Sequence, residues 1–541
     1  MKHYLSYFQD TVYHYWDKMA LTDFDGTTSY TYGDVARRMM WLNLLFSQQQ
    51  IKAGDKIAIC GRNSCNWAVA FLASVAYKAV VVSILPEFTG DSIHELVNHS
   101  DARVLFVGPW VRGKINCERM PNVDLFVAIE DMSVMSSKIP VSIGQIDELF
   151  ATTYKQGFSP RCFVLPTDNM DDVAVINYTS GSTGSPKGVM LTHRNLSSNV
   201  VFGQENIPNN PSKSIVSMLP LAHMFGLMFE LLYQLAGGTR VYFLTKSLTP
   251  ALLLRAFHEV KPYMILTVPL VVEKIFKRNV FPVFEKPFVR FMWSTPLLNL
   301  LVRGGVRRKL MEAFGGHLEY LIIGGAALNQ DVEQCMHQIH FPYTCGYGMT
   351  ECAPIVCYAE PRKYVFRSCG KVVDRMQLMI DSSNPRKVEG EILVKGDNVM
   401  RGYYKNLQAT DNIFNEDGWM RTGDIGVVDR RGNVFLRGRS KNMILGASGQ
   451  NIYPEEIEDQ LNSLEGVAES VIVERDGKLV GLVFPESMKD MDWDHLKQLM
   501  AENLKKLNLR LPSFSKVSDI ELVDKEFEKT PKHSIKRFLY K

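Results

Sequence analysis

Short runs of apolar and β-branched residues recur along most of the chain, and longer stretches with helical periodicity separate them. The runs stand at residues 56–60, 104–107, 173–177, 263–267 and 318–323. Near-continuous apolar strands that alternate with helices are typical of mainly parallel sheets with helices on their faces. The pattern therefore predicts an α/β fold, with layered, mainly parallel sheets in a large N-terminal domain.

The pattern changes near Gly438. Before this residue, a turn at Arg431 and Gly432 separates two short strands of a predicted hairpin. After it, the periodicity predicts helices at 455–461 and 493–507 and strands at 471–473 and 479–483. We therefore expect two domains, a large one of residues 1–437 and a small, mobile α+β domain of residues 438–541.

One apolar stretch, residues 67–85, is long enough to suggest a membrane-spanning helix. Lys78 lies inside it, and Ala- and Leu-rich sequence changes midway to a Val-rich segment. This change predicts a buried helix followed by a buried strand. The N-terminus lacks the apolar segment of a secretory signal, so we expect a cytoplasmic protein.

Residues 276–312 form an insertion that is rich in basic and aromatic side chains. Two interpretations are open. The insertion is either an amphipathic patch that contacts a membrane surface, which makes the protein peripherally membrane-associated, or a solvated pair of helices.

Composition excludes several classes of protein. The chain has 541 residues, with 46% hydrophobic and 22% charged, which excludes a disordered or fibrous chain. The net charge of +3 is too balanced for a protein that depends on binding phosphate backbones, so we expect no nucleic-acid partner. Nine cysteines without Cys-x-x-Cys pairs or matching histidines indicate reduced thiols and no zinc site.

The clearest chemical signal is a loop of Gly, Ser and Thr directly after the strand at 173–177. It reads Tyr178-Thr-Ser-Gly-Ser-Thr-Gly-Ser-Pro-Lys-Gly188. Glycines let several backbone N–H groups point into one concavity, hydroxyls add donors, and Lys187 adds a positive charge. The spacing differs from a Walker A motif, in which Lys follows Gly and precedes Ser or Thr. The loop is therefore predicted to bind a polyphosphate.

Three further polar segments stand in apolar surroundings downstream. They are Gly346-Tyr-Gly-Met-Thr-Glu351, Trp419-Met-Arg-Thr-Gly-Asp424 and Gly438-Arg439. Taken alone, each is compatible with an ordinary turn or a surface charge.

Together and in this order, these segments resemble the adenylate-forming (acyl-activating) enzymes, and most of all the AMP-forming long-chain fatty acyl-CoA synthetases. The resemblance extends from about Tyr30 to the C-terminus. It implies that ATP activates a fatty acid to an acyl-adenylate with release of pyrophosphate, after which a thioester with CoA forms. Mg²⁺ is the implied metal, and ATP and CoA are the implied co-substrates.

The resemblance also assigns the nucleotide site. Tyr347 would stack on adenine, Thr350 would contact the α-phosphate, and Glu351 would bind Mg²⁺. Asp424 would accept hydrogen bonds from the ribose hydroxyls, with Arg439 beside it. The phosphates would be held by the loop residues Thr179, Ser180, Gly181, Ser182, Thr183, Gly184 and Lys187. Thr183 is also an implied metal ligand.

Further positions follow from the same resemblance. His223 matches an aromatic gate over the carboxylate site, and Gly325 lies in a turn of small residues suited to a narrow alkyl tunnel. Lys441 occupies the hinge between the domains, and Gly449 lies in the loop that lines the pantetheine tunnel.

The C-terminal tail departs from the family pattern. Members usually carry a catalytic Lys in Thr-x-x-Gly-Lys, whereas Ser534 stands at that position here. We expect Lys536, or alternatively Lys532, to supply the missing charge. A basic, solvated tail without a catalytic role is the competing interpretation.

An apolar segment at 221–230 and the insertion both favour a long-chain fatty acid, because each buried methylene adds about 0.8 kcal/mol of discrimination. Two alternatives to a CoA ligase remain open from the sequence. One is a ligase that loads an acyl carrier protein, and the other is a non-catalytic sensor of acyl groups or nucleotides on the same fold. The sequence does not indicate the oligomeric state.

Overall fold

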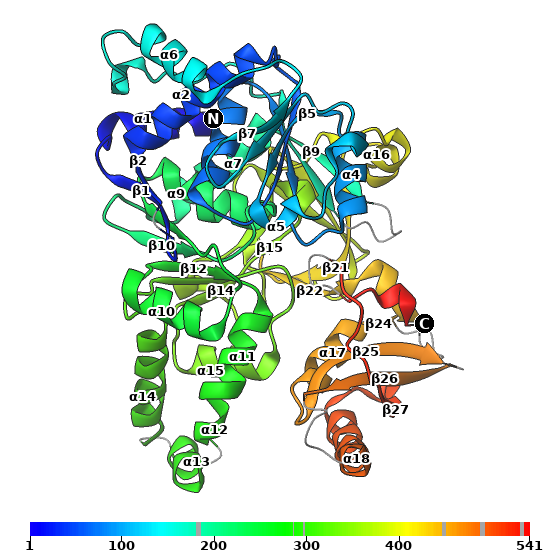
Figure 1. The fold of residues 1–541 in the computed structure, drawn as a ribbon. Coiled ribbons are helices and arrows are strands. Elements are labelled where there is room, and N and C mark those ends of the chain that lie inside the picture. The colour runs from blue at the N-terminus through cyan, green and yellow to red at the C-terminus, as the bar shows by residue number, and fades with distance from the viewer. Residues whose placement is uncertain are drawn as a thin grey trace.

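Two large sheets and a small C-terminal domain make up the protein (Figure 1). The structure is a computed structural model that describes residues 1–26, 28–179, 186–284, 286–295, 298–445, 451–475, 477–486, 493–530 and 535–540. The expected architecture, a large N-terminal domain of mainly parallel sheets with helices and a smaller C-terminal domain, is confirmed.

The first large sheet has eight strands in the order β20-β9-β8-β4-β3-β5-β6-β7. Its central strands are parallel, and β9 returns antiparallel along β8. The strands are β3 (Lys56–Cys60), β4 (Val80–Ile84), β5 (Ala102–Val107), β6 (Leu125–Ala128), β7 (Val134–Ser137), β8 (Val173–Thr179), β9 (Lys187–Thr192) and β20 (Gly402–Tyr403).

The apolar stretch at 67–85 lies in this sheet and its covering helix. Helix α3 (Cys65–Ala76) is buried along its whole length, with Trp67 stacked on Phe71, and β4 follows it. The prediction of a buried helix followed by a buried strand is therefore confirmed. Within the described ranges, no helix combines the length and apolar character needed to cross a bilayer.

The second large sheet has seven strands in the order β14-β13-β12-β10-β11-β1-β2, all parallel except β2. Because β12, β13 and β14 are parallel neighbours, the residues that follow them meet at one edge of the sheet. The strands are β1 (Met19–Asp23), β2 (Ser29–Thr31), β10 (Ser214–Ser217), β11 (Arg240–Phe243), β12 (Met264–Thr267), β13 (Tyr320–Ile323) and β14 (Tyr343–Cys345).

Helices cover both sheets, and several begin at side-chain caps. Helix α7 begins with a capping box in which Thr192 and Asn195 exchange hydrogen bonds with each other's backbone. The helices of this part are α1 (Tyr4–His14), α2 (Tyr32–Gln48), α4 (Gly90–His99), α5 (Pro109–Arg112), α6 (Ile143–Thr153), α7 (His193–Asn206), α8 (Met224–Gly226), α9 (Tyr233–Ala236), α10 (Pro250–Val260) and α15 (Gln330–Gln338).

The insertion at 276–312 is helical. It comprises the end of α11 (Pro269–Asn279), α12 (Phe281–Phe284), α13 (Pro287–Ser294) and most of α14 (Leu298–Ala313). Helix α13 lies at the lower tip of the molecule in Figure 1, packed against the start of α14. Large apolar side chains of this tip face solvent: Phe288, Phe291, Leu300 and Leu301.

A four-stranded antiparallel sheet and a three-stranded one complete the large domain. The predicted hairpin is confirmed: β21 (Met420–Val428) and β22 (Val434–Arg439) pair antiparallel, and Gly432 has the positive φ of +84° that its turn requires. The other strands are β15 (Tyr347–Gly348), β16 (Ile355–Tyr358), β17 (Lys371–Val372), β18 (Met376–Asp381) and β19 (Gly390–Gly396).

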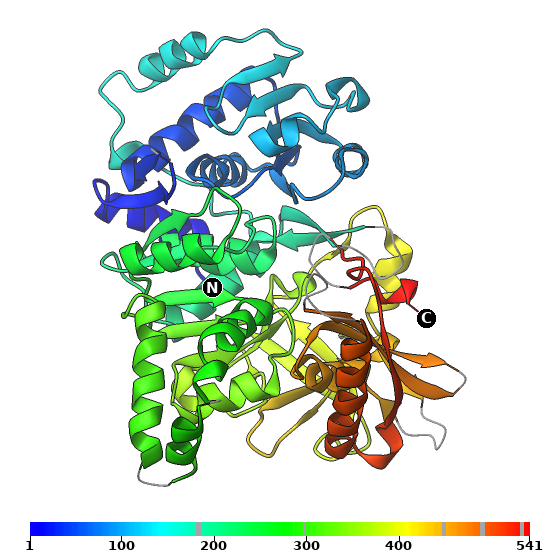
Figure 2. The same ribbon diagram turned by 60° about the horizontal axis from the view of Figure 1, so that its bottom comes forward.

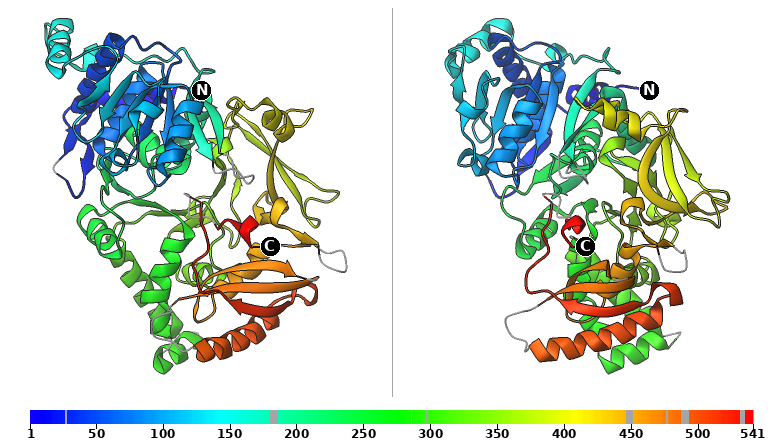
Figure 3. Two further views of the ribbon diagram at one scale, coloured as in Figure 1. Left: turned by 45° about the vertical axis from the view of Figure 1, so that its right-hand side comes forward. Right: turned by 90° about the vertical axis from the view of Figure 1, so that its right-hand side faces the viewer.

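The C-terminal domain has a hydrophobic core of its own, centred on Leu461, Val467, Val483 and Leu507. All four predicted elements are present as α17 (Pro454–Asn462), β25 (Val467–Arg475), β26 (Lys478–Pro485) and α18 (Trp493–Arg510), joined by β27 (Val517–Leu522). Short strands β23 (Ile444–Leu445) and β24 (Asn451–Ile452) precede them. Figures 2 and 3 show this domain (orange to red) beside the green helices of the large domain.

Polar contacts hold the two domains together. Arg367 of the large domain binds Glu333 (Nη1–Oε2, 3.2 Å) and Asp459 of α17 (Nη2–Oδ2, 3.3 Å). Burial raises the pKa of Asp459 to about 7, against the opposing effect of Arg367. Lys277 of α11 donates to the carbonyl of Asn462 at 3.0 Å, again on α17. The small domain is thus held by ionic contacts and hydrogen bonds, which a rotation can exchange more readily than a packed apolar interface.

Candidate functional site

The two ends of the predicted phosphate loop lie side by side. Thr179 ends β8 and Lys187 begins β9, and the two residues are register partners in the antiparallel pair. The hydroxyl of Thr179 donates to the carbonyl of Lys187 at 3.5 Å. Five of the assigned loop residues lie outside the described residues: Ser180, Gly181, Ser182, Thr183 and Gly184.

Lys187 and Glu351 meet through a third residue, Tyr403. The Nζ of Lys187 lies 4.9 Å from the centroid of the Tyr403 ring, within the range of a cation–π contact. The hydroxyl of Tyr403 donates to Oε1 of Glu351 at 3.0 Å. Strand β20 makes this contact possible, because it pairs with β9 and carries Tyr403 to the edge of the loop.

Thr350 and Glu351 lie on a single 3-10 turn, Thr350–Cys352, which Ala353 ends with a φ of +57°. The carbonyl of Glu351 accepts the N–H of Met400 at 2.8 Å, which ties this turn to the segment before β20. Thr350 and Glu351 are both half-buried. The turn therefore presents a hydroxyl and a carboxylate next to the end of the phosphate loop.

A second cluster joins Tyr347, Asp424 and Arg439. The hydroxyl of Tyr347 donates to Oδ2 of Asp424 at 2.6 Å, and Nε of Arg439 lies 3.1 Å from Oδ1. Asp424 and Arg439 are register partners in β21 and β22. Each carboxylate oxygen keeps lone pairs for further hydrogen bonds, so the group is oriented without being saturated.

Burial dominates the electrostatics of this cluster. It raises the pKa of Asp424, while Arg439 and the Tyr347 hydroxyl act in the opposite direction. The pKa of Tyr347 is raised well above its usual range, by burial and by the neighbouring Asp424. Tyr347 therefore stays a neutral donor that fixes the orientation of the carboxylate.

The predicted small-residue turn follows β13. Gly325 has a φ of +92°, and a Cβ on Gly324 would lie 3.2 Å from the ring of Phe225. His223 precedes α8, and its loop is fixed by Asn177 of β8, whose Nδ2 donates to the carbonyl of Ala222 at 2.7 Å. The apolar segment at 221–230, the glycine turn and the end of β8 thus lie close together.

Glu230 is a buried carboxyl that the sequence pattern places only within an apolar run. It lies on a π-helix, Leu227–Leu232, and accepts hydrogen bonds from the hydroxyl of Ser217 (2.8 Å) and the N–H of Leu219 (3.1 Å). Burial raises its pKa to about 8. Its contacts join the end of β10 to the helix that follows His223. In the sequence, a lone carboxylate in an apolar run is the signal that could have found it.

Lys441 and Lys536 lie on elements outside the strands and the 3-10 turn Thr350–Cys352 that carry these clusters. Lys441 is in the 3-10 turn Ser440–Asn442, directly after β22. Lys536 forms an ion pair with Glu528 in the small domain (Nζ–Oε2, 3.3 Å). Gly449, Lys532 and Ser534 lie outside the described residues. Tyr403 was not anticipated from the sequence.

The donor set fits Mg²⁺ only in part. Glu351 offers a carboxylate that keeps lone pairs beside its Tyr403 bond. Among the described residues, no group of three or more His, Cys, Asp and Glu side chains is arranged to hold a metal. Mg²⁺ usually keeps several waters and binds through one or two carboxylates plus substrate phosphates. Glu351 therefore fits a metal that arrives with a nucleotide.

Comparison with protein families gives two matches. The family described as AMP-binding enzyme matches residues 8–404, and the family described as AMP-binding enzyme C-terminal domain matches residues 441–540. The two matches together span most of the chain.

Individual relatives agree with these matches. The chain is 27% identical over 508 residues to long chain acyl-CoA synthetase 7, peroxisomal, of Arabidopsis thaliana, covering 87% of this chain and 71% of the relative. It is 31% identical over 353 residues to long-chain-fatty-acid–CoA ligase 4 of Saccharomyces cerevisiae, covering 61% of this chain and half of the relative. The crystal structure of ATP-bound MatB from Rhodopseudomonas palustris superposes with a TM-score of 0.78 over 100% of this chain and 98% of that chain, at 22% identity.

Proposed function

Because the chain belongs to the family of AMP-binding enzymes, we propose that it activates a long-chain fatty acid with ATP and transfers the acyl group to CoA. The first half-reaction forms an acyl-adenylate and releases pyrophosphate. The second forms the thioester and releases AMP. The relatives' names support this choice of acid and acceptor.

The observation that carries the proposal is the pairing of two polar clusters next to one glycine-rich loop. Lys187, Tyr403 and Glu351 form one cluster, at the end of the loop that is predicted to hold phosphates. The second cluster joins Tyr347 to Asp424. Tyr347 stands only four residues before Glu351 of the first cluster. A nucleotide that spans both would place its ribose at Asp424 and its phosphates near Lys187.

Charge neutralisation and positioning are the main demands of the first step. A carboxylate is a weak nucleophile, and the α-phosphate that it attacks is itself negatively charged. Lys187 offers a positive charge at the end of the loop, and Thr350 a hydroxyl donor. Mg²⁺ held by Glu351 would offset phosphate charge when bound. Asp424, already oriented by Tyr347 and Arg439, would fix the ribose and so the line of attack.

The second step requires the small domain to move. We place the hinge at Lys441, one turn after β22, where a few backbone dihedrals can absorb a rotation. At Gly438 the backbone passes so close to Tyr453 that a Cβ would lie 3.0 Å from its ring. A glycine here therefore allows the two domains to meet at the proposed boundary between residues 437 and 438.

The acid is proposed to be fatty because the segment next to His223 is apolar and buried. Most of its large side chains are fully enclosed, among them Leu227, Met228 and Leu231. Gly324 leaves room under Phe225 where a larger residue would close the space. The carboxyl of Glu230 in this segment accepts a hydrogen bond from Ser217 of β10. It is therefore not placed to bind the amine of an amino-acid substrate.

The class of acid can be tested by pyrophosphate release with palmitate, octanoate, benzoate and leucine. We expect palmitate to give the highest kcat/KM. Asp424→Asn should be inactive, whereas Asp411→Asn, an exposed residue of α16 (Leu407–Ile413), should match the wild type. Preference for benzoate or leucine would refute the fatty-acid assignment. Binding of ATP without turnover of any acid would favour a sensor.

The exposed tip of α13 and α14 supports a peripheral membrane contact. Such a contact suits the proposed substrate, because a long-chain fatty acid dissolves in membranes. Phe288 is 72% exposed and Leu301 68%, beside the basic residues of α14. Apolar side chains flanked by basic ones are typical of interfacial helices. Sedimentation with anionic vesicles should fall in Phe288→Ser. Unchanged sedimentation of this variant would assign the tip to a solvated helical pair.

A further inference from the structure

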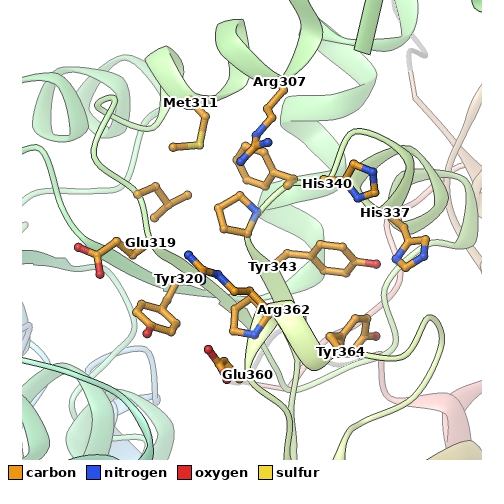
Figure 4. Close-up of a pocket in the computed structure, with 14 residues that line it drawn as sticks. Arg307, Met311, Glu319, Tyr320, His337, His340, Tyr343, Glu360, Arg362 and Tyr364 are labelled. Carbon is orange, nitrogen blue, oxygen red and sulfur yellow. The ribbon is translucent and has the colours of Figure 1, made fainter. Parts of the chain in front are cut away.

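A cavity of about 700 Å³ lies between α14, α15 and the first residues of β13 and β14, and none of the roles above uses it (Figure 4). It is open to solvent on one side. Its lining includes two arginines, two histidines and a group of aromatic rings.

The cavity lies at the opposite edge of the sheet from the nucleotide clusters. Tyr320 begins β13 and Tyr343 begins β14, whereas Gly324 and Gly346 follow the other ends of these strands. A four-residue strand separates the two edges by roughly 13 Å. A molecule in the cavity therefore leaves the ATP site accessible.

Two arginine side chains line the cavity. Arg307 extends into it from α14, and Arg362 enters from the turn Pro361–Lys363 (Figure 4). Within the described part of the chain, neither has a carboxylate within ion-pair distance. Each guanidinium offers five N–H donors, which an anion in the cavity can accept.

The carboxylates of the lining have partners elsewhere. Glu319 binds Lys213 at 2.8 Å, and Glu360 binds Lys363 at 2.9 Å. Neither lysine lines the cavity. The negative charge near the arginines is thus offset by cations outside, and the arginines are left for an anion.

The inner wall is aromatic. Tyr343 and Tyr364 are buried and meet edge to face, with centroids 5.1 Å apart. The hydroxyl of Tyr364 donates to Oε1 of Glu333 at 2.8 Å and that of Tyr343 to the Glu333 carbonyl at 3.4 Å, so both polar ends are engaged at Glu333. The rings themselves remain as an apolar surface below the arginines.

We propose that this cavity binds a phosphate-bearing molecule with a planar or apolar body. The phosphate would lie between Arg307 and Arg362, in the bidentate geometry that arginine favours, and the body would rest on the tyrosine rings. His337, in the last turn of α15, and His340, two residues after that helix, add ring nitrogens at the rim.

Two sources can supply this chemistry, a soluble aromatic phosphate and a phospholipid headgroup. The lipid source fits the geometry of α14. Leu300 precedes Arg307 by seven residues on this helix, a rise of about 10 Å along one face. A tip inserted at Leu300 would bring the arginine to the level of the headgroups.

The test uses the full chain without added nucleotide, because ATP carries phosphates and a planar base and would compete with the probes for the cavity. Arginines are modified with phenylglyoxal, and the modified positions are mapped by peptide mass spectrometry. One arm adds phenyl phosphate, and the other adds phosphatidylcholine vesicles with or without phosphatidic acid. We expect Arg307 and Arg362 to be protected while Arg308, which faces Glu312, stays reactive.

A pair of double variants separates the cavity from general charge. Arg307→Gln with Arg362→Gln should weaken probe binding about tenfold or more, because both charge-assisted contacts are lost. Arg308→Gln with Lys309→Gln removes the same charge from α14 outside the cavity and should bind phenyl phosphate like the wild type.

Protection in the phenyl phosphate arm alone would identify a soluble ligand, and protection by phosphatidic acid alone a lipid. The proposal is overturned if neither arm protects the two arginines, or if both double variants lose phenyl phosphate binding equally. Because protection is read at each arginine, the result does not depend on whether the enzyme activates fatty acids.

Discussion

Glu230 offers a direct test of how the acid-binding region is held together. Its carboxyl is fully buried on the π-helix and accepts hydrogen bonds from Ser217 and Leu219 at the end of β10. Replacement by Gln keeps an acceptor for the backbone and an amide that can donate to the Ser217 hydroxyl. The exchange therefore removes the titratable group and leaves the shape almost unchanged.

The sign of the effect follows from the raised pKa. Burial raises the pKa of Glu230 from 4.5 to about 8. The stability that the protonated carboxyl contributes is complete below pH 4.5 and is lost as the pH rises toward 8. Between pH 6 and pH 8 the folded state holds a proton that the unfolded state has released. The free energy of unfolding should therefore fall by about 2 kcal/mol over this interval, because a difference of one bound proton changes it by about 1.4 kcal/mol per pH unit.

Urea unfolding of the wild type and Glu230→Gln at pH 6 and pH 8 measures this difference. We expect the wild type to lose about 2 kcal/mol more than the variant over this interval. Glu95→Gln, an exposed residue of α4, is the control and should lose as much as the wild type. If Glu230→Gln shows the same pH dependence as the wild type, the carboxyl is not buried in the protonated form.

Four further substitutions address the chemistry. Glu351→Gln keeps the hydrogen bond from Tyr403 but loses the negative charge for Mg²⁺. The fold should stay intact, and pyrophosphate release should slow because at least ~2–3 kcal/mol of transition-state stabilisation is lost. Release near the wild-type rate would contradict the metal role. Lys441→Pro should impair one half-reaction and spare the other when each is measured separately, whereas equal losses would indicate misfolding and not a hinge. Of the variants Lys536→Ala and Lys532→Ala, one should adenylate ~10²-fold more slowly but still form thioester from preformed acyl-adenylate. A double variant that adenylates at the normal rate would show that the tail has no catalytic role.

Much of the fold can be predicted because strong local patterns agree with the tertiary structure. The buried helix and strand at 67–85 follow from a change in residue type around Lys78, and burial of α3 on all sides explains why that stretch lacks an amphipathic pattern. The hairpin at Gly432 is predictable because its turn needs a residue with positive φ.

Contacts between distant segments cannot be predicted in this way. Tyr403 joins Lys187 to Glu351 only because the two-residue strand β20 pairs with β9, and so short a strand has no periodicity. The ion pair between Arg367 and Asp459 depends on the orientation of the small domain, which no local pattern encodes. The cavity arginines likewise resemble ordinary surface charges until α14 and the turn at Arg362 are brought together.

The central claim is that the protein joins a fatty acid to CoA through an adenylate. The direct test incubates it with palmitate, ATP, Mg²⁺ and CoA, with a parallel reaction that contains an acyl carrier protein bearing its phosphopantetheine group instead of CoA. We predict equal amounts of AMP, pyrophosphate and palmitoyl-CoA, and no loading of the carrier protein. Formation of ADP, loss of the adenylate to hydrolysis in the presence of CoA, or preferential loading of the carrier protein would contradict the assignment.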